Sequence, residues 1–295
     1  MKVSVILPTY RRDAELARAL ESLAGQTMTD LEILVVDDND NAEWNDKVER
    51  VVQSFEQSHP AVCLRYVQNH PNLGSAKARN VGIAEASGAY ITFLDDDDIY
   101  LPEKVERQYR FMTEGDYEVS VTDLALYFED ERLSEHRKRA YLKNTDKDSL
   151  LRYHLMYHIT GTDTMMFDTA YLRSIGGFAP IDIGDEYYLM QRAIEGGGRF
   201  GYLPDCSVKA YVHEGEAGLS AGQSKIDGEN SLFAYKKQYF DHLDRGSRRY
   251  VRTRHHAVLA FAYLRMKKYG AFLVEGIHAM LISPSAGIRI LRDRG

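Results

Sequence analysis

Over residues 3–94, short apolar runs alternate with longer stretches whose apolar residues repeat at helical spacing, and this alternation limits the fold more than any other feature. The apolar runs are Val3–Leu7, Leu31–Val36, Val62–Val67 and Tyr90–Leu94. Such compact runs are typical of buried parallel strands. The stretches between them, Leu16–Leu23, Trp44–Phe55 and Ser75–Ala86, are expected to be helices, with Asp13 capping the first. Strand alternating with helix predicts an α/β fold, a Rossmann-like and mostly parallel sheet flanked by helices.

The remainder of the chain is less regular. Strands are expected at Val119–Phe128 and Thr164–Phe167, and a helix at Asp185–Ile194. From Gly222 onward the pattern is mainly helical, and from Arg245 to the end there are eleven Lys or Arg but two acidic residues. We therefore expect a catalytic domain over 1–221, with a nucleotide-binding half (1–100) and an acceptor half (101–221). A basic helical C-terminal extension is expected over 222–295.

Composition excludes several classes of protein. The chain has 295 residues, 44% of them hydrophobic, which is enough for a sizeable core. Its net charge of -7 argues against a nucleic-acid partner. Cys63 and Cys206 form no C-x-x-C pair, so neither a zinc site nor a disulfide framework is expected. No secretory signal and no run of 18 apolar residues is visible, which favours a cytoplasmic protein.

Acidic side chains follow the predicted strands. Asp37 and Asp38 come after the second strand, and the four carboxylates Asp95–Asp98 come after the fourth. Ligands of parallel sheets bind beyond the carboxyl ends of the strands, so these side chains are expected on one edge, beside Pro8, Thr9, Tyr10 and Arg11 from the end of the first strand. Four adjacent carboxylates repel one another and need a cation, and their oxygens suit Mg²⁺ or Mn²⁺. This interpretation is favoured over a solvated acidic turn.

Other segments have two readings each. Asp37 and Asp38 can accept hydrogen bonds from a base or a ribose, or can close a turn. Lys77 and Arg79, at the start of a helix, can neutralise a diphosphate or face solvent. 

Downstream, Asp185 and Glu186 can supply a general base or cap the helix they begin. His213 can bind the metal or a phosphate, although a lone histidine is more often structural.

Taken together, the motifs resemble family 2 glycosyltransferases, which have the GT-A fold. The resemblance covers roughly residues 1–216. The motifs that carry it are Val3–Tyr10, Leu34–Asp38, Gly74 with Ala78-Arg79-Asn80, Ala86 with Gly88 and Tyr90, Phe93–Asp98, and Ile175–Phe178 followed by Asp185-Glu186. Residues 222–295 match no part of the family pattern.

The resemblance implies an enzyme that uses a nucleoside diphosphate sugar, usually a UDP-sugar, with Mn²⁺ or Mg²⁺, and inverts the anomeric carbon. It implies that Asp38 contacts the base, with Thr9 and Asp37 nearby, and that Asp96 touches the ribose. Asp95 and Asp97 would form the D-x-D pair, with Asp97 in direct contact with the metal. The family commonly has Glu-Asp where this chain has Asp185-Glu186, so the resemblance does not decide which residue is the base.

Two alternative functions fit the motifs less well. A nucleotidyltransferase or dehydrogenase would need a glycine-rich loop after the first strand, and Pro8–Arg11 contains no glycine. An inactive nucleotide-sugar-binding module of the same fold is the remaining alternative, although it should have lost carboxylates that this chain retains.

The acceptor is expected to be a saccharide or a lipid-linked molecule. The basic extension is expected either to contact the inner face of a membrane or to pack on the catalytic domain or within a homo-oligomer.

Overall fold

The computed structural model describes residues 1–181, 184–212 and 222–292, and the side chains up to residue 290. The chain divides into two compact units. The first consists of Met1–Lys147 and Ile159–His213, and the second of Asp148–His158 and Glu214–Gly295.

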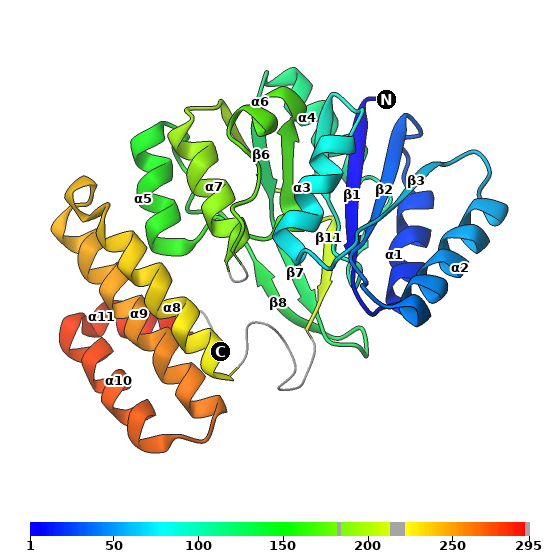
Figure 1. Ribbon diagram of the computed structural model, residues 1–295. Coiled ribbons are helices and arrows are strands. Elements are labelled where there is room, and N and C mark those ends of the chain that lie inside the picture. The colour runs from blue at the N-terminus through cyan, green and yellow to red at the C-terminus, as the bar shows by residue number, and fades with distance from the viewer. Residues whose placement is uncertain (182–183, 213–221, 293–295) are drawn as a thin grey trace. The chain divides into compact units, whose positions relative to one another are not determined.

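The first unit is built on a seven-stranded sheet (Figure 1). Its spatial order is β10-β6-β9-β4-β1-β2-β3, and β9 is the one strand that runs antiparallel to its neighbours. The strands are β1 (Val3–Thr9), β2 (Leu31–Asp37), β3 (Cys63–Gln68), β4 (Tyr90–Phe93), β6 (Val119–Thr122), β9 (Met165–Asp168) and β10 (Phe200–Leu203). The predicted mostly parallel sheet is confirmed.

A second sheet has four short strands in the order β5-β11-β7-β8. They are β5 (Ile99–Tyr100), β7 (Leu124–Tyr127), β8 (Leu133–Arg137) and β11 (Val208–Tyr211). The prediction of one strand over Val119–Phe128 was wrong, because this run is divided between the two sheets at Asp123. The Asp123 backbone N–H donates to the Asp205 carbonyl, and its carboxylate accepts from the Arg139 N–H and the Tyr202 hydroxyl. These bonds hold the chain at the point where it leaves one sheet for the other.

Helices cover both faces of the large sheet. They are α1 (Ala14–Ala24), α2 (Ala42–Ser58), α3 (Ser75–Glu85), α4 (Lys104–Glu114), α6 (Thr169–Ser174) and α7 (Asp185–Glu195), and a 3₁₀ turn, η1, spans Thr162–Thr164. Asp13 caps α1 as predicted, since its side chain accepts from the Ala14 N–H.

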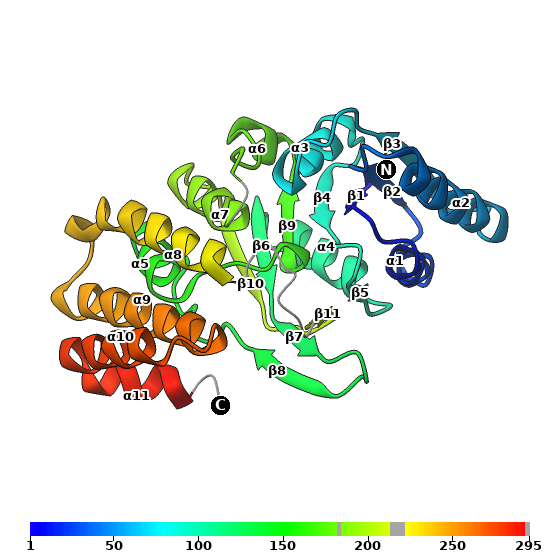
Figure 2. The ribbon, with the colours of Figure 1, turned by 60° about the horizontal axis from the view of Figure 1, so that its bottom comes forward.

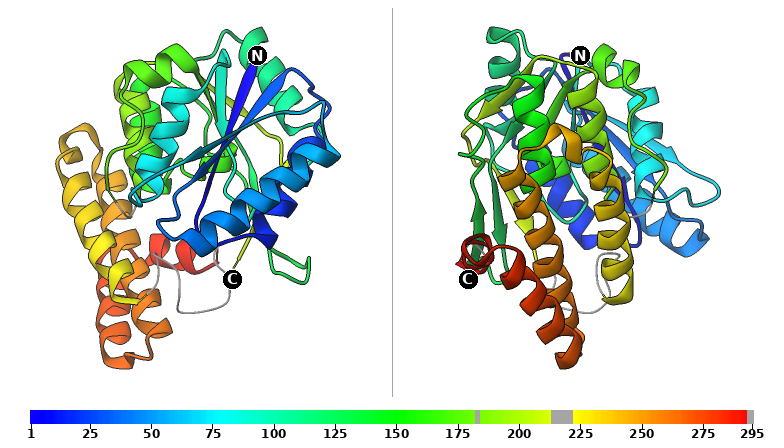
Figure 3. Two further views of the ribbon diagram at one scale, coloured as in Figure 1. Left: turned by 45° about the vertical axis from the view of Figure 1, so that its right-hand side comes forward. Right: turned by 90° about the vertical axis from the view of Figure 1, so that its left-hand side faces the viewer.

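Side chains on the two faces of β1 pack against different helices. Val3, Val5 and Leu7 join the core formed with α1, α2 and α4. Ile6 points to the opposite face, where a Cβ on Gly82 of α3 would lie 2.5 Å from its side chain. Glycine is needed there because α3 lies so close to the sheet. Figure 3 shows α3 in cyan on one side of the blue strands and α1 and α2 on the other.

The second unit is helical, as expected for the end of the chain (Figure 2). It contains α5 (Lys147–Tyr157), α8 (Gly222–Lys237), α9 (Arg245–Arg265), α10 (Tyr269–Ile282) and α11 (Pro284–Arg292), with a 3₁₀ turn, η2, at Phe240–His242. Helix α9 packs against α8, α10 and α11. Helix α5 comes from the middle of the chain and had no predicted place in this unit. Among the described helices, none is both long enough and apolar enough to cross a bilayer.

Candidate active site

The ends of β1, β2 and β4 bring the predicted polar residues to one edge of the sheet. Thr9 pairs in register with Asp37 across β1 and β2, and Ile6 pairs with Phe93 at the end of β4. The acidic turn Asp95–Asp98 follows β4, so its carboxylates lie beyond the same edge. Parallel register therefore brings together residues that are far apart in the sequence.

Asp96 connects this acidic turn to the end of β1. Its carboxylate accepts from Thr9 Oγ1 at 2.7 Å, from the Tyr10 N–H at 3.2 Å and from Arg12 Nη1 at 2.6 Å. Burial raises the pKa of Asp96 to about 6, against the opposing charge of Arg12. Arg12 also lies 2.8 Å from Asp97 Oδ2, so one guanidinium balances two carboxylates. The sequence analysis missed Arg12, although it directly follows the predicted loop.

The rest of that loop is more open. Tyr10 and Arg11 are exposed, and Pro8 is half-buried. The Arg11 N–H donates to Asn39 Oδ1 at 2.9 Å, which ties the loop after β1 to the turn after β2.

Asp37 and Asp38 are both buried and both hold backbone turns. Asp37 accepts from the Tyr66 hydroxyl at 2.6 Å and closes an Asx turn with the Asn39 N–H at 2.9 Å. Asp38 accepts from the Leu73 and Gly74 N–H groups at 2.9 and 2.8 Å, and thereby holds the loop that leads into α3. The turn-closing alternative therefore describes the contacts of both residues.

Asp95, Asp98 and Asp163 form a cluster of carboxylates close enough to hold a metal ion, with oxygens within 4.8 Å of one another. Asp163 lies in η1 and accepts from the Asp95 N–H at 2.7 Å, while Asp98 accepts from the Tyr211 N–H at 2.9 Å. Burial raises the pKa of Asp163 to about 7 and raises the pKa of Asp98 well above its usual value. A hydrogen bond between the two carboxyl groups adds to the rise in the pKa of Asp98 and opposes the rise in the pKa of Asp163. Asp163 was not predicted from the sequence, where its one signal was its place beside the strand predicted at Thr164–Phe167.

A buried lysine lies behind this group. Lys104 Nζ donates to Thr92 Oγ1 and to the Tyr100 hydroxyl, each at 2.6 Å, and the Tyr100 hydroxyl donates to the Asp163 carbonyl at 2.9 Å. Burial lowers the pKa of Lys104 well below its usual value, although the charge of Asp163 opposes the shift. Lys104 therefore supports η1 from the core.

Arg79 joins the acidic turn to the start of α7. Its Nη2 lies 2.5 Å from Asp95 Oδ1 and its Nη1 lies 3.1 Å from Asp185 Oδ2. Arg79 is 7% exposed, whereas Lys77 on the same helix is exposed. Of the two basic residues predicted to face a diphosphate, Arg79 thus lies between carboxylates and Lys77 faces solvent.

Asp185 and Glu186 have different surroundings at the start of α7. Burial raises the pKa of Asp185, and the charge of Arg79 opposes this shift. Glu186 Oε2 accepts from the Gly161 N–H at 2.7 Å, and burial raises its pKa as well. Glu186 therefore anchors the turn that leads into η1, and Asp185 faces Arg79 and Asp95.

The predicted metal set was Asp95, Asp97 and His213. The structure groups Asp95 with Asp98 and Asp163 and pairs Asp97 with Arg12. His213 lies outside the described residues. A further group that could hold a metal, His256, Glu275 and His278, belongs to the second unit.

The comparisons with known proteins find glycosyltransferases. A family model described as glycosyl transferase family 2 matches residues 4–173. An uncharacterised glycosyltransferase of Methanocaldococcus jannaschii is 32% identical over 160 residues, which are 53% of each chain. A Campylobacter jejuni protein named GalNAc(5)-diNAcBac-PP-undecaprenol beta-1,3-glucosyltransferase is 39% identical over 97 residues, 33% of this chain and 30% of that protein. The chain thus spans about half the length, or less, of these curated relatives.

Solved structures show the same fold. Residues 1–349 of TarS from S. aureus, in complex with UDP-GlcNAc, match with a TM-score of 0.61 and 18% identity, covering 95% of this chain and 91% of that one. The mannosyltransferase PcManGT from Pyrobaculum calidifontis, in complex with GDP-Man and Mn²⁺, matches with a TM-score of 0.64 and 18% identity, covering 99% and 86%. At this identity the likeness establishes the architecture alone, and the predicted GT-A type fold is confirmed.

Proposed function

This chain belongs to glycosyl transferase family 2, and from that premise we propose that it transfers a sugar from a nucleoside diphosphate sugar to an acceptor hydroxyl with inversion at the anomeric carbon. A UDP-sugar is the proposed donor, because the fold is that of TarS, which binds UDP-GlcNAc. A GDP-sugar is the second choice, after the mannosyltransferase complex.

The observation that carries the proposal is the link between Asp95 and Asp185 through Arg79. In the proposed site Asp95 belongs to the donor side and Asp185 to the acceptor side. Transfer needs both substrates held in one geometry, because positioning supplies much of the rate acceleration. A buried arginine between the two carboxylates fixes their separation before either substrate binds.

The acidic turn fits a divalent cation, because its closely spaced carboxylates are the oxygen ligands that Mg²⁺ and Mn²⁺ prefer. We assign the metal to Asp95 and Asp97, whose side chains are 34% and 13% exposed. Asp98 and Asp163 are 6% and 4% exposed and burial raises the pKa of each, so in this proposal they support the turn from beneath. When bound, Mn²⁺ or Mg²⁺ supplies positive charge that stabilises the leaving diphosphate.

Asp185 is the proposed general base. Its carboxylate is not occupied by the backbone of another loop, whereas Glu186 holds the Gly161 N–H. The pairing of Asp185 with Arg79 favours the ionised form, against the effect of burial, and fixes the direction of the carboxylate that would accept the proton of an acceptor hydroxyl.

Donor binding is proposed along the strand edge between Thr9 and the start of α3. Exposed Lys77 and the first amides of α3 can meet the diphosphate, since helix N-termini favour anions. Asp38 contributes by shaping the loop before α3, and Asp96 by holding the end of β1.

The proposed acceptor is a saccharide carried on a lipid, as in the name of the Campylobacter jejuni relative. An inactive sugar-nucleotide-binding module of the same fold is the alternative. Retention of Asp95, Asp97 and Asp185 together favours the enzyme.

A two-step experiment tests the proposal. Thermal shift with Mn²⁺ and a panel of UDP- and GDP-sugars should reveal a donor that raises the melting temperature, because a ligand that binds only the native state stabilises it. Release of free nucleoside diphosphate from that donor should then require Mn²⁺ and Asp185. Donor binding without any release, with and without candidate lipid-linked saccharides, would support the inactive module instead.

A further inference from the structure

Helix α10 exposes an unusually apolar face. Tyr269, Leu273, Val274, Ile277 and Leu281 are each between 51% and 76% exposed. Successive residues turn by about 100° around a helix, so these five fall within one arc of about 140°. Large contiguous apolar patches on a protein surface usually mark an interaction site.

The opposite side of α10 is already packed. Ala279 is buried in a small cluster with Ala257 of α9 and Ile290 of α11. One face of α10 therefore packs within its own unit, and no described residue covers the other face.

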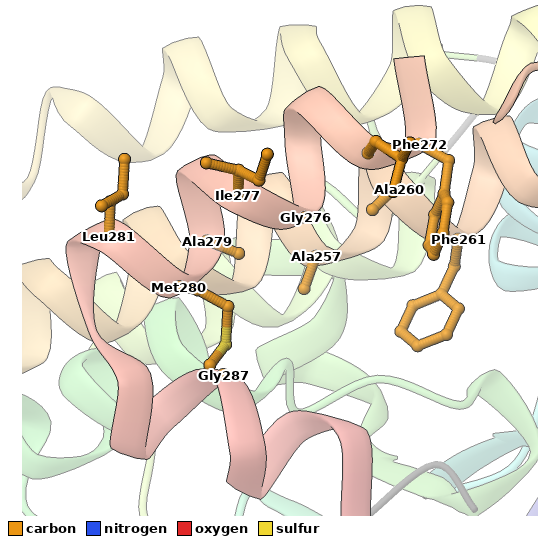
Figure 4. Close-up of a pocket in the computed structure, with 11 residues that line it drawn as sticks. Ala257, Ala260, Phe261, Phe272, Gly276, Ile277, Ala279, Met280, Leu281 and Gly287 are labelled. Carbon is orange, nitrogen blue, oxygen red and sulfur yellow. The ribbon is translucent and has the colours of Figure 1, made fainter. Parts of the chain in front are cut away.

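A hollow of about 350 Å³ lies among α9, α10 and α11 (Figure 4). Phe261 and Phe272 line one end and Met280 the other, where its sulfur lies beside Gly287. Leu273, Ile277 and Leu281 also line it, so the hollow is continuous with the exposed face.

Basic residues lie at both ends of this apolar face. Arg265, Lys267 and Lys268 are exposed just before α10 begins, and at its far end Arg249 donates to the Ile282 carbonyl at 3.0 and 2.6 Å. From Arg245 to Arg292 the sequence has ten Lys or Arg and one acid, Glu275. That acid is paired with His256 at 2.7 Å.

We propose that α10 docks on an anionic membrane surface, with its apolar face among the acyl chains and the basic residues at its ends on the lipid headgroups. Basic charge beside an exposed apolar helix face is the arrangement that binds anionic lipid interfaces. A second copy of the chain would bring the same positive charges to the contact, whereas an anionic bilayer offers the opposite charge. Flexible acyl chains can also fill an irregular apolar hollow.

Vesicle co-sedimentation of the full chain tests this inference, with vesicles of phosphatidylcholine alone or mixed with phosphatidylglycerol. We expect binding to the anionic vesicles at low salt, and binding at least about tenfold weaker to the neutral vesicles or at high salt. The variant Lys267→Ala/Lys268→Ala should lose about tenfold in affinity for the anionic vesicles, and Ile277→Gln/Leu281→Gln should lose at least as much.

Leu133→Gln is the matched control, because Leu133 is 53% exposed but lies on β8 of the first unit, and it should bind like the parent. Circular dichroism and thermal melting establish that each variant is folded. The inference is overturned by a parent that ignores anionic vesicles at low salt, by α10 variants that bind like the parent, or by a parent dimer in vesicle-free buffer that Ile277→Gln/Leu281→Gln dissociates. Since no sugar nucleotide is present, none of these outcomes depends on the proposed transfer activity.

Discussion

Asp95 and Asp185 are held together by one guanidinium, with Arg79 Nη2 2.5 Å from Asp95 and Nη1 3.1 Å from Asp185. Asp95 follows β4 and Asp185 begins α7, so the contact joins two distant parts of the first unit. Arg79 is buried, so its positive charge needs the two carboxylates as partners, and they need Arg79. Removing one partner from a buried ion pair costs more than the pair itself contributes, because the remaining charge is left unbalanced.

Arg79→Met should therefore lower both stability and activity. We expect a loss of about 3 kcal/mol in the free energy of unfolding, measured in urea. Among molecules that remain folded, kcat/KM for transfer should fall about 100-fold, because Asp95 and Asp185 lose their fixed separation. Arg79→Lys keeps the charge but not the two-armed geometry, so it should recover more stability than activity.

Arg110→Met is the matched control for these measurements. Arg110 is exposed and pairs with Glu106 on the surface of α4, and such pairs contribute about 0.5 kcal/mol. If Arg79→Met and Arg110→Met lose equal free energy of unfolding and equal kcat/KM, the pairing of Arg79 with Asp95 and Asp185 has no special role.

Asp185→Asn should separate chemistry from donor binding. We expect kcat to fall by about 10²- to 10⁴-fold, the usual contribution of a general base, while the donor Kd measured by calorimetry stays close to that of the parent. Glu186→Gln keeps an oxygen that can accept from the Gly161 N–H, so it should lose far less activity. If Glu186→Gln is the inactive variant and Asp185→Asn is not, the roles assigned to the two residues are reversed.

The dependence of transfer on Mn²⁺ should require the Asp97 carboxylate. Asp97→Ala should abolish Mn²⁺-dependent transfer and remain folded, since the partly exposed Arg12 keeps Asp96 as its partner. Calorimetric titration with Mn²⁺ should show the loss of one site. His256→Gln, made in parallel, removes a ligand from the separate group in the second unit and should leave transfer intact. If Asp97→Ala carries out Mn²⁺-dependent transfer at the parent rate, Asp97 is not a metal ligand.

The regular elements were predictable where local pattern and burial coincide. Strands β1, β2 and β4 are buried on both faces, so they are mostly apolar runs in the sequence. Strand β8 is short, charged and mostly exposed, and β5 has two residues, so neither has a recognisable pattern. Helix α5 has a helical sequence, but its membership in the second unit depends on contacts with distant residues.

The site was predictable only in part, for a related reason. The acidic turn was placed correctly because it directly follows a buried strand. Asp163 joins it because β9 inserts between β4 and β6, an order that no local pattern reveals. Arg79 was predicted to neutralise a diphosphate or to face solvent, because its pairing with a carboxylate of α7 cannot be read from the local sequence. Arg12 and Lys104 likewise owe their roles to partners that the fold brings to them.

The raised pKa of Asp163 predicts a pH-dependent stability. Burial raises the pKa of Asp163 to about 7 in the folded chain, above its value in the unfolded chain. The folded state therefore holds its proton more tightly, and this contribution to stability is complete at low pH and is lost as the pH rises from about 4 to about 7. Asp163→Asn cannot ionise, so in EDTA it should gain stability relative to the parent over that range, by on the order of 2 kcal/mol at about pH 8. Urea unfolding at several pH values measures the difference.

Asp116→Asn is the control for this measurement. Its side chain in the parent is 87% exposed, so its free energy of unfolding should differ from that of the parent by no more than about 0.5 kcal/mol at every pH. A difference for Asp163→Asn that stays flat or shrinks with rising pH would mean that Asp163 is already ionised in the folded protein.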